Sequence, residues 1–138
     1  MKTTIVIILC LVGTRCLSQS FYLKLNEYQA ATRIRNTEGR NVQISKTYLD
    51  DGSFDLTWEG DIWQGILYFN EYSTSALCCI IPRTPEVLNT MVENFNKNQV
   101  KISDTEWRVY NGDGVFRVKL LYAKQFDKYV FYASPSRN

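Results

Sequence analysis

The feature that most constrains this fold is the alternation of apolar and polar residues in NVQISKTYLDDGSFDLTWE, residues 41–59. Successive side chains of a β-strand point to opposite faces, so a period of two indicates a strand with one buried face. The alternation runs on both sides of residues 50–52, and Asp-Gly is typical of the tight turn between two paired strands. The segment therefore predicts an antiparallel β-hairpin.

Other strand-like segments follow this hairpin, most of them apolar and each bounded by polar or turn residues. They occupy residues 62–69, 76–81, 100–110, 115–123 and 128–133. Before the hairpin, FYLKLNEY at residues 21–28 could form a first strand, whereas residues 29–40 are polar and indicate a loop or a short helix. We expect an antiparallel sheet of five to seven strands, and the sequence shows no internal repeat.

One helix is expected after Pro82, which cannot continue a sheet ladder. Thr84 can cap a helix, Pro85 suits its first position, and Glu86 places an acid in its first turn. The apolar residues that follow recur with helical spacing, so the helix is expected at about residues 84–96. The sum is an α+β fold, in which one main helix packs on the sheet.

The N-terminus reads MKTTIVIILCLVGTRCLSQS, with Lys2, then an apolar run at residues 5–12, then the small residues Ser18 and Ser20. This layout is typical of a secretory signal peptide, and the run is too short to span a bilayer, although a retained anchor is an alternative. We expect cleavage after Ser18 or Ser20. The mature chain would be one extracellular domain, residues 21–138, without a transmembrane segment.

Charge and residue types narrow the function. The sequence has 16 basic and 14 acidic residues, and cleavage would remove Lys2 and Arg15, leaving a net charge near zero. A neutral chain argues against nucleic acid as the partner and gives little protection against self-association. There is no histidine, which removes the commonest general base and most zinc sites. We expect no enzyme activity, no catalytic residues, no metal and no cofactor.

Four carboxylates near turns are an alternative to that expectation. Glu59 and Asp61 flank Gly60, and Asp50 adjoins Asp51. Aspartate favours turns for conformational reasons, so turn chemistry is the simpler interpretation. A catalytic carboxylate pair would need burial in a cleft.

Cys78 and Cys79 are the cysteines that remain after cleavage. On a strand they point to opposite faces, so a bond between them would strain the backbone. Three interpretations stay open. They are two buried thiols, an intermolecular disulfide that links a homodimer, or a strained disulfide between neighbours.

Two segments carry a resemblance to a known family. CCIIPRTPEVLNTMVENF, residues 78–95, resembles the part of BRICHOS domains in which cysteine ends a strand and a helix follows. DIWQGILYF, residues 61–69, is similar to the family's stretch of an aspartate before an apolar strand, which gives Asp61 the place of the family's aspartate and makes Gln64 a weaker candidate. The likeness covers about residues 45–98. The family's second cysteine near the C-terminus is absent here, and its second helix is hard to find.

The resemblance implies a secreted chaperone or pro-domain that binds extended, β-prone polypeptide segments and limits their aggregation. A buried Asp61 would favour this interpretation, and a solvated turn aspartate would count against it. Candidate client-binding residues are aromatic or apolar strand residues, for which core packing is the alternative: Trp58, Trp63, Ile66, Tyr68 and Phe69.

Other functions remain open beside the chaperone. One is a non-enzymatic binding module for an apolar ligand or a partner protein. Another is a precursor that releases VFRVKLLYAKQFDKYVFYA, residues 115–133, as a membrane-active peptide. For the chaperone and for the binding module we expect a polypeptide client or a protein partner.

Overall fold

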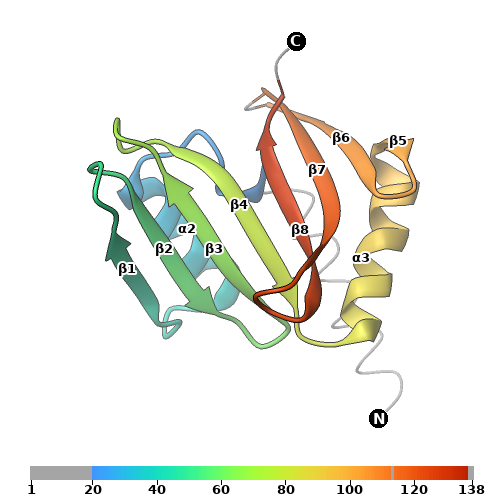
Figure 1. Ribbon diagram of the computed structural model, residues 1–138, viewed down its shortest axis with the longest axis horizontal. Helices are drawn as coiled ribbons and strands as arrows, with labels where there is room; N and C mark the ends of the chain where they lie inside the picture. The colour runs from blue at the N-terminus through green and yellow to red at the C-terminus, as the bar shows by residue number, and fades with distance from the viewer. Residues whose placement is uncertain (1–19, 113, 137–138) are drawn as a thin grey trace.

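The computed structural model describes residues 20–112 and 114–136, and the expected signal peptide lies outside them apart from Ser20. The described chain forms a short 3-10 turn, two α-helices and eight β-strands (Figure 1). In chain order these elements are η1 (Ser20–Tyr22), α2 (Glu27–Glu38), β1 (Ile44–Tyr48), β2 (Phe54–Glu59), β3 (Trp63–Phe69), β4 (Ser75–Pro82), α3 (Pro85–Asn98), β5 (Val100–Ser103), β6 (Glu106–Asn111), β7 (Gly114–Ala123) and β8 (Lys128–Pro135).

The α+β class and the antiparallel sheet are confirmed, but the expected counts are wrong. The sheet has eight strands within the described residues, not five to seven, and α2 accompanies α3, so there is no single main helix. The helix α3 does begin where the sequence predicts it. Its cap is Thr84, whose Oγ1 accepts a hydrogen bond from the Val87 N–H at 3.3 Å.

Most of helix α2 lies in residues 29–40, the segment expected to be a loop or a short helix, and its first two residues lie in the segment expected to be a strand. Asn26 Oδ1 accepts from the Gln29 N–H at 2.9 Å, and Gln29 Oε1 accepts from the Asn26 N–H at 3.1 Å. This reciprocal capping box starts the helix. Only a narrow stripe is buried, formed by Ala30, Ile34 and Thr37, which explains why the segment looks polar.

The segment of residues 21–28 is not a strand. Phe21, Tyr22 and Lys24 have φ between 51° and 58°, a left-handed conformation that interrupts any ladder. The apolar side chains of this segment are nevertheless buried, at no more than 6% exposure for Leu23 and Leu25. They fill the space between the helices and the sheet, so their apolar character reflects core packing and not strand pairing.

The strand order is β1-β2-β3-β4-β8-β7-β6-β5. Each half of the chain supplies a helix followed by a four-stranded meander, and the last strands of the two halves, β4 and β8, pair antiparallel in the middle of the sheet. If each strand of the first half is exchanged with its counterpart in the second half, the same strand order results, read from the other edge of the sheet. The fold is therefore one arrangement used twice, although the sequence shows no repeat.

Both helices contribute to the core on one face of the sheet, and Figure 1 shows α2 behind β1 to β3. The ring of Phe95 on α3 joins the parts, with centroids 5.9 Å from Phe21, 5.3 Å from Trp107 and 5.4 Å from Phe131. We call the opposite face the open face, because no helix of the described chain covers it. No described helix is long and apolar enough to cross a membrane.

The hairpin of β7 and β8 reaches past the strand it joins. Its arms pair from Phe116–Pro135 to Ala123–Lys128, whereas β4 pairs with β8 only from Cys78 to Ile80. The free tip packs on the open face, where Phe126 contacts a small cluster that includes Cys79 and Ile81. Figure 1 shows this loop in front of the end of β4, so it forms a wall beside the open face.

Candidate functional site

The open face carries a small pocket over β2, β3 and β4, beside the β7–β8 hairpin tip, which we call the open-face pocket. Its volume is about 220 Å³. Strand alternation supplies its floor, since the lining side chains of β2, β3 and β4 are those that point away from the helices. The lining residues are Leu49, Asp55, Ile66, Tyr68, Leu77, Cys79, Gln125, Phe126 and Tyr132.

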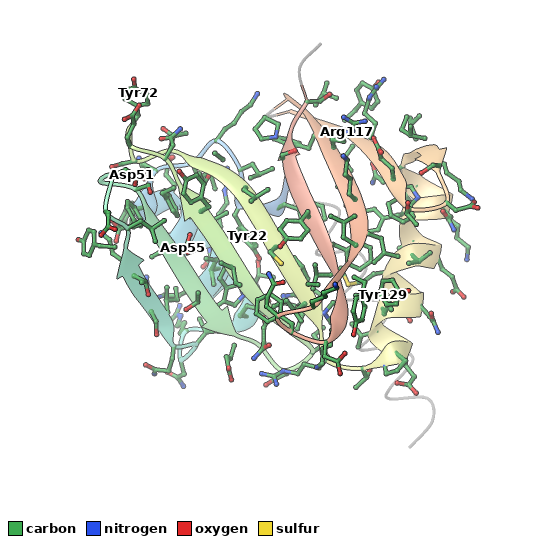
Figure 2. All side chains as sticks on the ribbon, viewed as in Figure 1. Tyr22, Asp51, Asp55, Tyr72, Arg117 and Tyr129 are labelled. Atoms are coloured by element: carbon green, nitrogen blue, oxygen red, sulfur yellow. The ribbon has the colours of Figure 1, made fainter. Side chains whose placement is uncertain are left out.

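Asp55 is the one acid in this lining, and the lining includes no lysine or arginine. It stands between Thr47 of β1 and Tyr68 of β3 in the register of the sheet, and Figure 2 shows it on the open face. Burial raises the pKa of its carboxyl. Among the described residues no donor or cation compensates its charge, so this carboxylate is an uncompensated negative group in a largely apolar pocket.

Cys79 and Tyr132 form the opposite side of the pocket, paired across β4 and β8. Burial raises the pKa of the Cys79 thiol to about 11, and a hydrogen bond with Tyr132 opposes this only in part. Burial also raises the pKa of Tyr132, whose hydroxyl interacts with Cys79 and Gln125. Both groups are therefore neutral at physiological pH, and the negative charge of the pocket comes from Asp55.

A second, larger groove crosses the end of the sheet, from the loop after α2 to the hairpin tip. Its volume is about 870 Å³, and it shares Ile66 and Phe126 with the open-face pocket. Its rim is polar, and one of its acids, Glu59, is already paired. Glu59 accepts from Gln64 Nε2 at 2.9 Å and lies 3.5 Å from Arg83.

The candidate client-binding residues do not share a face. Trp58, Trp63 and Phe69 are at most 3% exposed and belong to the core under the helices, so they cannot contact a client in this fold. Ile66 and Tyr68 point to the open face and line the pocket. The five residues mix both faces of neighbouring strands, and alternation allows only every second residue of a strand on one face.

Asp61 lies exposed in the bend between β2 and β3. This is the solvated turn aspartate expected to count against the BRICHOS interpretation. Gln64, the weaker candidate, donates its amide to Glu59 on the open face of β2 and β3. Asp50 and Asp51 are also exposed turn residues, and Asp51 accepts from the Ser53 N–H at 3.0 Å.

Cys78 and Cys79 point to opposite faces, as the strand period predicts. Cys78 belongs to the core under the helices, and Cys79 to the cluster under the hairpin tip. Within the described residues neither is in a disulfide, and they are 0% and 4% exposed. A disulfide to another chain would require the sheet to open at β4, so the geometry favours the interpretation as two buried thiols.

The edge strand β1 is a second surface feature, and its main chain is open to pairing. The Leu49 N–H donates to the Ser53 oxygen at 2.9 Å, which fixes the hydrogen-bonding parity of the hairpin. In an antiparallel pair this parity alternates. The main-chain groups of Ser45 and Thr47 therefore face β2, and those of Ile44, Lys46 and Tyr48 face away from the sheet.

The side chain of Lys46 is drawn away from this edge. Its ammonium lies 2.8 Å from Glu27 Oε2, and 4.6 Å and 4.2 Å from the ring centroids of Tyr48 and Phe54. The hydrogen bond to Glu27 raises the pKa of the Lys46 ammonium. A lysine on an edge strand usually deters pairing with other chains, but the ammonium of Lys46 is paired with Glu27 on the helix side of the sheet.

Sequence reasoning missed Asp55, Phe126 and Tyr132. The position of Asp55 could be predicted, because the period of two in SFDLTWE places its side chain on the other face of the strand from Phe54 and Leu56. Phe126 and Tyr132 come from the far end of the chain, and no local pattern indicates that their hairpin folds over β4.

Within residues 20–112 and 114–136, no three metal-ligating side chains of His, Cys, Asp or Glu come together. No protein-family model, curated protein or solved structure matches this chain.

Proposed function

We propose that this protein is a secreted, non-catalytic binding protein that captures extended, β-prone polypeptide segments at β1 and limits their aggregation. This is the chaperone-like role that the BRICHOS resemblance implies. The observation that carries the proposal is the regular edge of β1, whose outer side pairs with no strand of the described chain. The leader-like N-terminus and the lack of histidine support the secreted and non-catalytic parts.

An extended segment can add to such an edge by main-chain hydrogen bonds, which depend little on its sequence. Ile44, Lys46 and Tyr48 each offer an outward N–H and C=O, and the five residues of β1 pair with β2 without a bulge. The exposed ring of Tyr48, at 72% exposure, adds apolar surface beside the incoming strand. These features favour capture of a segment that is itself short of hydrogen-bonding partners.

The alternative function, release of residues 115–133 as an active peptide, fits this fold poorly. That segment contains most of β7 and β8, and β8 is a central strand paired on both sides. Val130, Phe131 and Ala133 are fully buried. Cutting the segment out would divide the sheet and expose its core.

The test is the growth of fibrils from a synthetic β-prone peptide, followed by dye fluorescence with increasing amounts of the purified protein. The decisive variant is Lys46→Pro. Proline removes the outward N–H of residue 46 but leaves the ladder to β2, as edge positions tolerate. We expect the protein concentration needed for half-suppression to rise about five- to tenfold, the effect of losing one hydrogen bond.

Two matched variants interpret that result. Lys46→Ala loses the ion pair with Glu27 but keeps the outward N–H, so it should suppress fibrils like the wild type. Thr47→Pro removes an N–H that faces β2, so it should lower the melting temperature. If Lys46→Pro is folded and suppresses fibrils as well as Lys46→Ala does, capture at β1 is wrong.

A further inference from the structure

The open-face pocket combines an uncompensated carboxylate with aromatic walls. Asp55 is the single charged residue of the lining, and Tyr68, Phe126 and Tyr132 contribute rings around it. A carboxylate that is partly buried among apolar groups is costly unless an opposite charge pairs with it. Within the described chain that partner is missing.

We propose that this pocket binds a small ligand that carries a protonated amine next to an aromatic or alkyl group. The ammonium would pair with the Asp55 carboxylate and lie against the tyrosine rings, whose faces attract cations. The apolar part would contact Ile66 and Leu77 on the floor of the pocket and Phe126 on its wall. An anionic ligand would instead be repelled by the negative charge of Asp55.

The size of the pocket limits the ligand further. Sites for drug-sized molecules usually measure roughly 300–1,000 Å³. At about 220 Å³ the open-face pocket is smaller, so it fits a compact amine with one ring or a short alkyl chain. The neighbouring groove is larger, but Arg83 and Gln64 already engage its Glu59.

This binding activity goes beyond strand capture and does not depend on it. The pocket opens on the sheet face and is lined chiefly by side chains of β2, β3, β4 and the β7–β8 hairpin, whereas capture uses the main chain of β1. A failure of one proposal therefore leaves the other standing, and the two assays are separate.

Affinity for the amine should depend on pH through Asp55. The other titratable groups in the lining are Tyr68, Cys79 and Tyr132, and Lys119 of β7 stands opposite Tyr132 in register but outside the lining. Lys46 on β1 is held by Glu27 on the other face. Because burial raises the pKa of Asp55, affinity should be full at neutral pH and fall as the pH drops through that raised value.

The experiment is isothermal titration calorimetry of the purified protein with three probes of similar shape. Phenethylamine carries the amine, phenethyl alcohol replaces it with a neutral group, and 3-phenylpropanoate carries a negative charge. We expect phenethylamine to bind with at least about tenfold higher affinity than the alcohol, and the acid not to bind.

Two variants locate the site. Asp55→Asn keeps the shape of the side chain but removes its charge, so it should abolish the preference for phenethylamine over the alcohol. Glu59→Gln changes an acid of the same strand that lies outside the pocket, so it should leave the preference unchanged. The proposal is overturned if no probe binds, if all three bind alike, or if Asp55→Asn binds phenethylamine as tightly as the wild type.

Discussion

Trp58 and Trp107 lie on β2 and β6, the corresponding strands of the two halves of the sheet, and both are buried under the helices. Trp107 Nε1 donates to Asn96 Oδ1 of α3 at 2.9 Å, whereas Trp58 Nε1 has no acceptor among the described residues. In register, Trp107 stands opposite Val118 and Trp58 opposite Gly65. The second half holds its tryptophan by a hydrogen bond, and the first holds it by close fit to a glycine.

The free edges of the two halves differ as well. β1 has five regularly paired residues, whereas β5 has four, with an irregular register between Lys101 and Ser103. β5 also follows α3 directly and lies beside it in Figure 1. Short, irregular and partly covered edges resist pairing with other chains. The two halves have the same topology, yet the edge strand β1 is exposed and the edge strand β5 is protected. Both candidate sites lie largely in the first half.

The largest effect should come from filling the space that Trp58 occupies over Gly65. A Cβ at residue 65 would overlap the indole ring, so Gly65→Val should lower the free energy of unfolding by about 3 kcal/mol. Urea denaturation measures this. Gly112→Ala is the control, because no atom lies near the added methyl group, and it should have little effect. If Gly65→Val unfolds at the same urea concentration as the wild type, the Trp58 ring is free to move and is not held by its fit to Gly65.

A smaller effect should separate the two tryptophans themselves. Trp58→Phe and Trp107→Phe remove similar volume, but only the second leaves a partner, Asn96 Oδ1, without its donor. We expect Trp107→Phe to cost about 1 kcal/mol more in unfolding free energy. Combining each change with Asn96→Ala should show coupling for Trp107 and none for Trp58. Equal losses in the two single variants would contradict the comparison.

The smallest effect on stability should come from the first hairpin turn of each half, where Asp51 and Asp104 differ in their bonds. The Ser53 hydroxyl and N–H donate to Asp51, and the hydroxyl bond is the main reason that the pKa of Asp51 is lowered. A lowered folded-state pKa gives stability above the unfolded-state pKa, and this is lost as the pH falls through the lowered value.

Asp51→Ala should therefore reduce the melting temperature slightly at neutral pH and not at strongly acidic pH. Asp104→Ala in the β5–β6 turn removes an exposed ion pair with Lys101 at 3.0 Å, and it should change little at either pH. Equal effects of both variants across pH would show that the Asp51 bonds contribute nothing.

Local patterns predicted the elements whose signals are local. The β1–β2 hairpin was readable from its period of two and its Asp-Gly turn, and α3 from Thr84 and Pro85. The start of α2 also had a signal, the Asn26–Gln29 capping box, but its buried stripe is too narrow to stand out. The extra strand arose where residues 100–110 turn at Asp104, between β5 and β6.

The open-face pocket could be predicted only in part. Alternation places Asp55 on the face away from the core, and the same rule would have separated Ile66 and Tyr68 from Trp63 and Phe69. The pairing of β4 with β8 joins residues more than fifty positions apart, such as Cys79 and Tyr132. No local pattern encodes such a contact, so the wall of the pocket becomes visible only in the fold.

The central position of β8 has a consequence for how the molecule is made. The strand that completes the sheet, β8, is synthesised after every other described strand, so β4 has an unpaired edge until β8 has emerged from the ribosome. Pairings distant in sequence form slowly, and unpaired edges are prone to aggregation while they wait. During synthesis the nascent protein therefore has an exposed strand edge of its own, which β8 must cover before another chain pairs with it.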